Sequence, residues 1–274
     1  MINGNRPARG VSRPEVRWII IAITLGLVVA FLSSLSGPGR AGAAAVVPAN
    51  VLDLTNWKIT LPIAATGSST AMEIKQPQLA TYSIDPYFVA NPGGAGVQFR
   101  APVGGATTSG SSYPRSELRE MTTSGTQNAS WSTSSGKHTM TVTASATHLP
   151  AVKSQVVTAQ IHDASNDVIE VVADGLRVNA PGSYSICLRY NGATQSPCMD
   201  LYYKSGTAYT VRFNASGGHI KVLYNGVQKY DFKDNRSGCY FKAGAYTQSN
   251  PSKGDAPTDY GNVIIYGLQV THTA

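Results

Sequence analysis

One short segment, YFKAGAYTQ at residues 240–248, gathers side chains that could do chemistry on a single face. Successive side chains of a β-strand point to opposite sides. One face therefore carries Tyr240, Lys242, Gly244, Tyr246 and Gln248, and the other carries Phe241, Ala243, Ala245 and Thr247. A cation, two phenols and an amide on one face can bind an anion and transfer protons, whereas the apolar face suits a core.

Two other segments have the same property. In RSELRE, Arg115, Glu117 and Arg119 share a face, and in AQIHD, Gln160 and His162 do so. If the three segments are neighbouring strands of one sheet, their polar faces form one groove with cations, an amide, an imidazole and a phenol. Each segment alone would more often be the solvated side of a sheet, and RSELRE alone could be a surface ladder of ion pairs.

The elements that would position these side chains are short strands. From residue 52 onward, segments that alternate apolar and polar residues are separated by Asn-Gly, Gly-Gly or Ser-Gly pairs. No composition shift, long linker or repeat divides residues 50–270, and helical periodicity is sparse. The pattern predicts an all-β protein with a single β-sandwich or jelly-roll domain over residues 44–274.

The formal charge of +7 is concentrated at the N-terminus. Residues 1–43 hold five arginines and one glutamate, which leaves 17 basic and 14 acidic residues, or +3, for the rest of the chain. This weakly basic remainder gives poor support for binding nucleic acid through bulk charge, and we expect no nucleic-acid partner.

Residues 1–43 have the parts of a secretory signal peptide. An arginine-bearing segment precedes the uncharged run at residues 18–39, and Ala41-Gly42-Ala43 has the small-x-small form of a cleavage site. The apolar run could just span a bilayer, so a retained anchor is the alternative. Because the Ala-rich segment follows at once, we favour cleavage and predict a secreted, extracellular protein without membrane contact afterwards.

Three cysteines suit an oxidising compartment. Cys187 and Cys198 flank LRYNGATQSP, whose Asn191-Gly192 pair predicts a turn, so a bridge across a hairpin is one option. Cys239 could instead be a partner in the bridge. The sequence has no CxxC pair, which argues against a zinc site or a redox centre.

YPRSELRE, QIH and YFKAGAYTQ, in this order, resemble the three signature segments of polysaccharide lyase family 7, the alginate lyases. NWKITLP resembles the N-terminal strand of the family, so the resemblance spans about residues 50–270. It implies a jelly-roll sandwich of two antiparallel sheets, whose concave sheet forms the substrate cleft. It also implies that alginate, a polymer of mannuronate and guluronate, is cleaved by β-elimination.

Carried over by motif, the resemblance implies that the catalytic residues are Arg115, Gln160, His162 and Tyr246. It implies cleft or supporting roles for Glu117, Arg119, Lys242 and Gln248, and for Tyr240 we expect sugar stacking or hydrogen bonding. In β-elimination a proton leaves C5 beside a carboxylate, which Arg115 and Gln160 would neutralise. His162 would complete this clamp or act as the base, depending on the side of the ring from which the proton leaves.

Tyr246 is the expected proton-transfer group. Its unperturbed pKa near 10 makes it a poor base at neutral pH. We expect Arg115, His162 and Lys242 to stabilise the phenolate and to lower this pKa, so that Tyr246 takes the C5 proton, protonates the departing O4, or does both. We further expect Gly244 to leave room for a sugar ring.

We expect no metal and no cofactor. A calcium-dependent lyase would hold an ion with Asp and Glu, whereas the one cleft-facing carboxylate that the pattern identifies, Glu117, lies between arginines that it would orient. In the family, Ile in the middle of QIH is associated with guluronate-containing blocks, so Ile161 favours these. We predict an endolytic monomer that acts on alginate.

Three other functions fit parts of the pattern. A carbohydrate-binding module of jelly-roll type needs aromatic residues and donors, but not a phenol grouped with Arg, Gln and His. A lyase for another polyuronate, such as a glucuronan, would use the same residues, because the carboxylate and the C5 proton are common to both. Hydrolysis would need paired carboxylates, and Glu117 has no obvious partner. The other histidines, His138, His148, His219 and His272, are expected at the surface.

Overall fold

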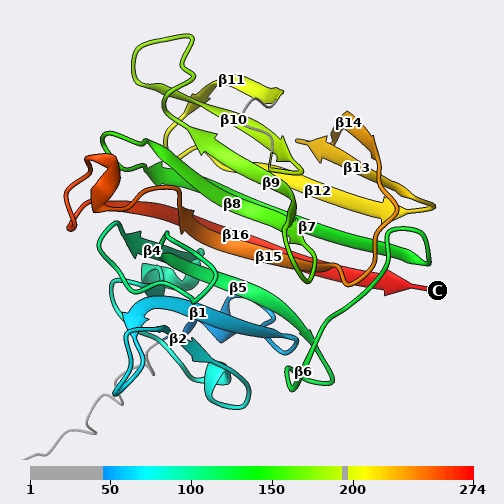
Figure 1. The fold of residues 1–274 in the computed structure, drawn as a ribbon, viewed down its shortest axis with the longest axis horizontal. Coiled ribbons are helices and arrows are strands. Elements are labelled where there is room, and N and C mark those ends of the chain that lie inside the picture. Colours follow the sequence, from blue (N-terminus) through cyan, green and yellow to red (C-terminus); the bar gives the residue numbers. More distant parts are fainter. Residues whose placement is uncertain (1–45, 193–196) are drawn as a thin grey trace, which may run out of the picture. The chain divides into compact units, whose positions relative to one another are not determined.

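The computed structural model describes residues 46–192 and 197–274, which form a β-sandwich (Figure 1). The predicted signal peptide, residues 1–43, lies outside the described residues. No helix in the described part of the chain is long and apolar enough to cross a membrane. What helical structure these residues have is in short 3₁₀ turns: η1 (Pro48–Asn50), η2 (Gln78–Ala80), η3 (Pro92–Gly94) and η4 (Pro251–Lys253).

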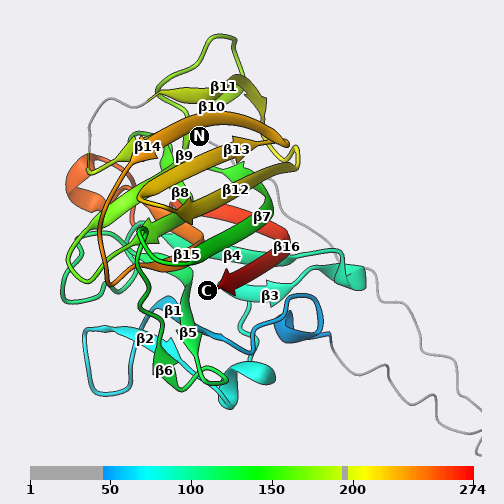
Figure 2. The ribbon, with the colours of Figure 1, turned by 90° about the vertical axis from the view of Figure 1, so that its right-hand side faces the viewer.

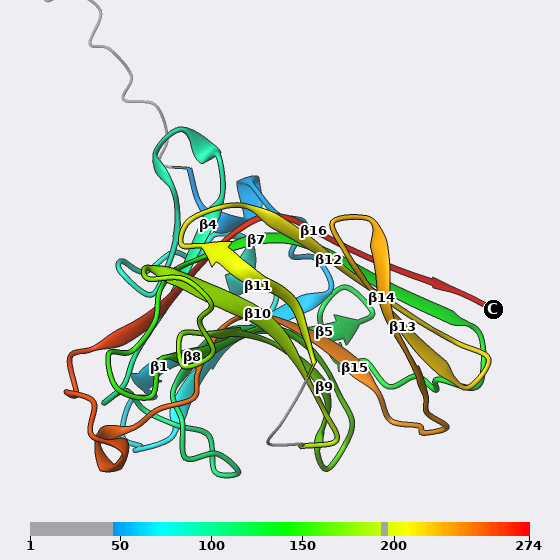
Figure 3. The ribbon, with the colours of Figure 1, turned by 90° about the horizontal axis from the view of Figure 1, so that it is seen from above.

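The larger sheet has nine strands. They are β1 (Trp57–Ala64), β2 (Ala71–Ile74), β5 (Arg115–Thr122), β6 (Gln127–Asn128), β8 (Gln155–His162), β9 (Asp167–Asp174), β10 (Ser183–Tyr190), β11 (Cys198–Lys204) and β15 (Tyr240–Thr247). Their order is β11-β10-β9-β8-β15-β5-β1-β2, and β6 pairs with β5. Seen from above in Figure 3, β9 and β10 are long arcs, so this part of the sheet is strongly curved.

The smaller sheet has seven strands. They are β3 (Phe88–Ala90), β4 (Val97–Pro102), β7 (Lys137–His148), β12 (Tyr209–Ser216), β13 (His219–Tyr224), β14 (Val227–Lys233) and β16 (Tyr260–Thr273). Their order is β14-β13-β12-β7-β16-β4-β3, and Figure 2 shows β14, β13, β12 and β7 side by side. All strand pairs in both sheets are antiparallel, which confirms the predicted all-β sandwich.

The core lies between the two sheets and takes one face of each strand. On β15 the predicted apolar face is confirmed, because Phe241, Ala243 and Ala245 are fully buried in the core. Phe99 of β4 and Phe213 of β12, in the smaller sheet, belong to the same buried core cluster. Burying one large apolar side chain contributes about 1.5–3 kcal/mol, so this face fixes which way the polar residues of β15 point.

The three strands with polar faces are neighbours, as predicted. Strand β15 lies between β5 and β8, and Lys242 is paired with Arg119 on one side and with Gln160 on the other. β15 comes late in the chain and is inserted between two strands that come earlier. The site is therefore assembled from segments that are distant in sequence.

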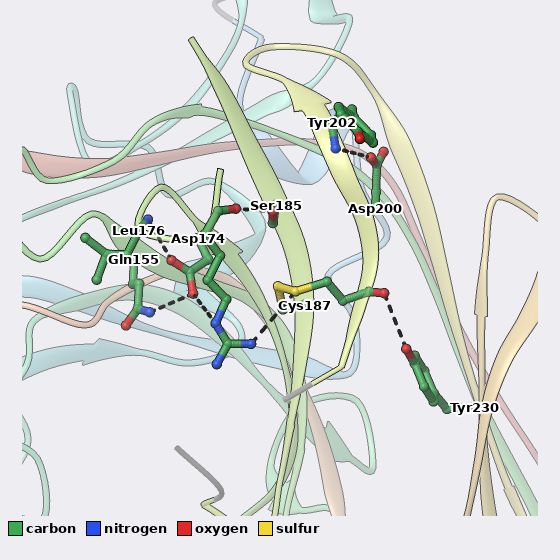
Figure 4. The surroundings of a disulfide bond; sticks show 10 residues. Gln155, Asp174, Leu176, Ser185, Cys187, Asp200, Tyr202 and Tyr230 are labelled. Atoms are coloured by element: carbon green, nitrogen blue, oxygen red, sulfur yellow. Dashed lines mark hydrogen bonds and ion pairs between the residues drawn. A yellow bond between two sulfur atoms is a disulfide. The ribbon is translucent and has the colours of Figure 1, made fainter. Parts of the chain in front are cut away.

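A disulfide bridge joins Cys187 of β10 to Cys198 of β11, with a Cα–Cα distance of 3.7 Å. This confirms the bridge across a hairpin and leaves Cys239 as a free, buried thiol, whose pKa burial raises to about 12. Figure 4 shows Asp174 and Gln155 of the curved sheet near the bridge, where the Gln155 amide donates to the Asp174 carboxylate at 2.8 Å. The bridge thus fastens the edge strand β11 to the strands that carry the site.

Candidate active site

A cavity of about 520 Å³ opens on the face of the larger sheet that points away from the core. Its walls come from β5, β8, β9, β10 and β15 and from the loops beside them. Five of the nine residues predicted for the site line this cavity: Arg115, Gln160, His162, Tyr246 and Gln248. The four residues predicted to be catalytic are therefore brought together around one space.

Glu117 lies beneath the cavity and holds three of its neighbours. Its Oε2 accepts from Arg115 Nη1 at 3.1 Å and from Lys242 Nζ at 2.6 Å. Its Oε1 accepts from Gln160 Nε2 at 2.5 Å. Burial would raise the pKa of Glu117, but Lys242 and Arg115 outweigh it and hold this pKa below its ordinary value. Glu117 is therefore ionised and fixes the orientation of both cations and of the amide.

Lys242 is also buried beneath the cavity, with 7% of the residue exposed. Burial lowers the pKa of Lys242 to about 8, although Glu117 opposes the shift. At neutral pH the ammonium is still charged, so Arg115 and Lys242 together exceed the single negative charge of Glu117. The floor of the cavity therefore keeps a net positive charge, which suits a carboxylate ligand.

Arg115 lies against the phenol of Tyr246, with its guanidinium carbon 3.7 Å from the ring centre. One nitrogen of the guanidinium donates to Glu117, whereas its buried Nε has no hydrogen-bond partner. An unpaired buried donor is costly unless a ligand satisfies it. Arg115 thus combines a fixed position with hydrogen-bonding capacity left for a bound anion.

Tyr246 keeps its proton, contrary to the sequence-based expectation of a lowered pKa. Burial raises the pKa of Tyr246 above its ordinary value of 10, and the nearby Arg115 only partly offsets this. The ammonium of Lys242 is 5.8 Å from the ring centre and is largely balanced by Glu117. The hydroxyl lies 3.0 Å from that of Ser111. A neutral phenol facing the cavity is suited to donate a proton.

His162 is the complementary group. Its Nδ1 lies 2.5 Å from the carbonyl oxygen of Asp163, which can only accept, so Nδ1 carries the proton. Burial lowers the pKa of His162 below 6.5 despite this hydrogen bond, so the ring is neutral at pH 7. The lone pair of a neutral ring is then on Nε2, and His162 can act as a base.

The ring of Tyr240 lies against His162 and Arg119. Its ring is stacked on that of His162, with centres 5.3 Å apart, and its hydroxyl is 3.1 Å from Nδ1 of His162. The guanidinium of Arg119 lies 3.9 Å from the ring centre of Tyr240. Arg119 is on β5 and His162 is on β8, so the two residues lie on opposite sides of β15. Both contact the ring of Tyr240. Neither Arg119 nor Tyr240 is among the residues that line the cavity.

A family model for alginate lyases matches residues 52–272 of this chain. The chain belongs to the alginate lyases of polysaccharide lyase family 7. It is similar to the solved alginate lyase AlgAT5 of this family, with 48% identity and a TM-score of 0.77 over 84% of this chain and 100% of that one. An alginate lyase from Corynebacterium sp. is 46% identical, with a TM-score of 0.77 over 84% and 99% of the two chains. A curated alginate lyase from Klebsiella pneumoniae is 26% identical over 91% of this chain and 98% of its own length.

In this alginate lyase the backbone of β15 itself requires a glycine at position 244. Gly244 has a φ of 149°, and a Cβ at this position would lie 2.4 Å from the carbonyl oxygen of Ser116 and 2.8 Å from Cα of Glu117. The pairing of β15 with β8 also shifts register between Ala243 and Tyr246. Gly244 therefore lets β15 approach β5 closely at a bulge, just before Tyr246.

The lyase cavity also contains charged residues that the sequence analysis missed, notably Glu170 of β9 and Arg189 of β10. Glu170 is buried, with 4% of the residue exposed, and Arg189 donates to it at 3.0 Å. A signal was present in both cases, since Glu170 is a single acid in the apolar run VIEVV and Arg189 a single cation in ICLRY. An unmatched charge inside an apolar strand indicates a special environment.

Glu170 supplies the second carboxylate that the hydrolysis alternative lacked. Glu117, however, is enclosed by its three donors beneath the cavity, so it has no room to activate a water. The described residues, 46–192 and 197–274, contain no group of three or more His, Cys, Asp and Glu that could hold a metal ion.

Proposed function

We propose that this alginate lyase is exported and cleaves alginate within the chain by β-elimination without a metal, with a preference for guluronate-containing blocks. In this proposal Arg115, Gln160, His162 and Tyr246 are the catalytic residues. The observation that carries it is the pairing of a neutral His162 with a neutral Tyr246 at one cavity, above a floor of net positive charge.

The first step of the proposal is neutralisation of the uronate carboxylate. Arg115 and Gln160 are both held by Glu117 and both line the cavity, so they can donate to one carboxylate without reorganising. Lys242 adds a positive charge from beneath. The charge that develops when C5 loses its proton then spreads into a carboxylate that is already neutralised.

The proton transfers follow from the protonation states of His162 and Tyr246, which are both neutral at pH 7. His162 Nε2 takes the C5 proton, the C4–O4 bond breaks as a C4–C5 double bond forms, and the Tyr246 hydroxyl gives its proton to the departing O4. Two groups whose pKa values are pushed apart, one below 6.5 and one above 10, are both in the required state at neutral pH.

The division of labour between His162 and Tyr246 supports the guluronate preference. In guluronate the C5 proton and O4 leave from opposite sides of the ring, so a separate base and acid are needed, whereas in mannuronate they leave from the same side. A similar family 7 alginate lyase, 26% identical with a TM-score of 0.68, was solved with a product written GGG. Ile161 is fully buried in the core and contributes only indirectly.

Endolytic action is supported by the width of the polar face. Five adjacent strands, β5, β15, β8, β9 and β10, each bring a residue to the cavity. These residues are Arg115, Tyr246, Gln160, Glu170 and Arg189. Five strands at about 4.8 Å spacing span about 19 Å, which is wide enough to contact sugars on both sides of the cleaved bond.

Ultraviolet absorbance of the unsaturated product tests the proposal. The purified protein is given polyguluronate, polymannuronate and mixed blocks, with glucuronan as a control, each with and without chelator. We expect the fastest rise on polyguluronate, no effect of chelator, and a loss of about 10³-fold in Tyr246→Phe. His162→Asn should lose more activity on polyguluronate than on polymannuronate. New reducing ends without absorbance would overturn elimination, and equal losses on both blocks would overturn the role of His162.

Export is tested separately, by N-terminal sequencing of the protein recovered from the culture medium. We expect a mature chain that begins at or near residue 44. An intact N-terminus in the membrane fraction would instead establish a retained anchor.

A further inference from the structure

Beside the catalytic residues, Arg189 is the centre of a second polar cluster. Its Nη1 donates to Gln248 Oε1 at 2.7 Å and to Glu170 Oε2 at 3.0 Å, and its Nη2 donates to Gln155 Oε1 at 3.0 Å. All four residues line the cavity. The side chains of Arg189 and Glu170 are 19% and 5% exposed. Arg189 is therefore held in place but reachable from the cavity, whereas Glu170 is enclosed.

Arg189, at the centre of this cluster, lies two or more strands away from Arg115 and Gln160, the residues proposed to bind the carboxylate at the cleaved bond. Glu170 is paired with Gln160 of β8 on one side and with Arg189 of β10 on the other. Arg189 is thus two strands, or about 10 Å, from Gln160. A carboxylate held by Arg115 and Gln160 is too far away to reach Arg189 at the same time. Any carboxylate bound at Arg189 must belong to another sugar of the chain.

We propose that Arg189, flanked by Gln155 and Gln248, binds the carboxylate of a second uronate of the substrate, and that this carboxylate takes the place of Glu170 on the guanidinium. The inference rests on the proposed function, because it assumes a polyuronate in the cavity. A planar guanidinium with amides on both sides is well matched to a carboxylate. The ligand class is a uronate within an oligomer.

The Arg189–Glu170 pair is poorly explained as a stabilising element alone. Removing two charges from water costs about as much as their attraction returns, so a buried ion pair is weak evidence for stability. A glutamate also adds negative charge to a cavity that would bind a polyanion, which needs a reason. Holding Arg189 in position when no substrate is bound, and releasing it when a uronate arrives, is such a reason.

Charged and titratable groups face Glu170 from several elements. They are Arg189 on β10, Glu117 on β5, Lys242 and Tyr246 on β15, and Asp167 on its own strand. On β8 the residue opposite is the uncharged Gln160, and His162 of the same strand lines the same cavity. Burial, with Asp167 and Glu117, outweighs Arg189 and raises the pKa of Glu170 to about 7. Because a substrate carboxylate would raise this pKa further, binding is coupled to protonation of Glu170.

The sign of the pH effect follows from this coupling. Below about pH 7 Glu170 is neutral, so Arg189 is free for the substrate and KM is low. Above it Glu170 is ionised, competes for Arg189 and repels the polyanion, so KM rises. Glu170→Gln keeps an oxygen that accepts from Arg189 but does not titrate, so KM should stay low above pH 7 and this step should disappear.

An oligosaccharide length series with three variants tests the inference. In Arg189→Ala we expect KM to rise about tenfold on long oligomers, with a much smaller change on the shortest oligomer that is cleaved, since a lost charge-assisted hydrogen bond acts only on substrates that reach it. Arg189→Lys should restore part of the affinity. Arg212→Ala is the matched control, because Arg212 lies on β12 of the other sheet, exposed and bonded to Thr141.

Two results would overturn the inference. One is an unchanged KM on long oligomers in Arg189→Ala together with a lower melting temperature, which would make the pair structural. The other is a pH dependence of KM that is the same in Glu170→Gln and in the parent protein. Neither can be confused with failure of the proposed function, in which the parent protein would form no unsaturated product from any alginate.

Discussion

Two glutamates on strand β5, Glu117 and Glu120, have the same burial and opposite surroundings. They are 1% and 2% exposed, and because they are three residues apart they lie on opposite faces of the strand. Glu117 faces the cavity, and its partners are side chains that can also act on a substrate. Glu120 faces the core side, and its partners are groups of the fold itself.

Glu120 joins four strands and a loop. It accepts from the indole of Trp131 at 3.0 Å and from the backbone N–H of Phe241 at 2.8 Å. Its other oxygen is 2.6 Å from His272 Nε2, and His272 in turn lies 2.7 Å from His138, Nδ1 to Nδ1. The expectation that His138 is at the surface was wrong, since it is 8% exposed and stacked on Trp131. Glu120 thus ties β15, β16 and, through the histidines, β7 to β5.

The comparison shows that burial and residue type do not reveal what a carboxylate does. Both carboxylates are satisfied by three groups, so both stabilise the structure in which those groups are held. Around Glu117 these groups are two cations and an amide, and two of them reach into the cavity. The partners therefore decide between positioning reactive groups and fastening strands.

The largest expected effect is a loss of activity when Glu117, on the cavity side of β5, is replaced. Glu117→Gln removes the charge that holds Arg115 and Lys242 and places an amide N–H2 group near them, so both cations move from their positions. We expect kcat/KM on alginate to fall by about 10²-fold or more, since misplacement by about 1 Å costs this much. Steady-state absorbance assays at a temperature where circular dichroism shows a folded protein provide the measurement.

The matched substitution on the core side, Glu120→Gln, should act on stability. The amide can still accept from Trp131 and Phe241, but these hydrogen bonds lose their charge assistance. We expect the free energy of unfolding to fall by about 1–2 kcal/mol, with kcat/KM of the folded protein within about twofold of the parent. Urea unfolding and activity are measured on the same samples. Comparable losses of activity in both variants would remove the distinction between the two faces.

The smallest expected effect is a pH dependence that distinguishes Lys242 from Arg115, the two cations that Glu117 holds. Of these two, Lys242 titrates near neutral pH. With a pKa of about 8, its ammonium loses its charge as the pH rises, and the floor of the cavity loses the excess positive charge. We expect kcat/KM to be about tenfold lower at pH 9 than at pH 7. In the Glu170→Gln background, where Glu170 does not contribute, Lys242→Arg should move this fall to higher pH. A profile that is identical in the variant would show that another group controls the alkaline limb.

Much of the fold and site was predictable because strand periodicity is a local property. The alternation in residues 240–248 placed Phe241 and Ala243 in the core and Lys242 and Tyr246 on the other face, as observed. The order of the three motifs, together with the resemblance, located the four residues that meet at the cavity.

Strict alternation failed where a bulge interrupts it. His162 and Gln160 face the cavity, so strict alternation along β8 would place Thr158 on the cavity side as well. The pairing of β8 with β9 shifts register between Val157 and Ala159, and Thr158 accepts from the buried hydroxyl of Tyr209. Gln155 consequently lines the cavity, one residue out of phase with the motif.

The sequence by itself determined the all-β class, the two faces of the key strands and the residue types at the site, because these depend on neighbours along the chain. Only the tertiary structure decided that Glu117 and Lys242 lie beneath the cavity and that Arg189 meets Glu170 beside it. It also reversed the expected pKa shift of Tyr246, because desolvation by surrounding strands outweighs one nearby cation. Burial and charge pairing depend on segments distant in sequence, and no local pattern encodes them.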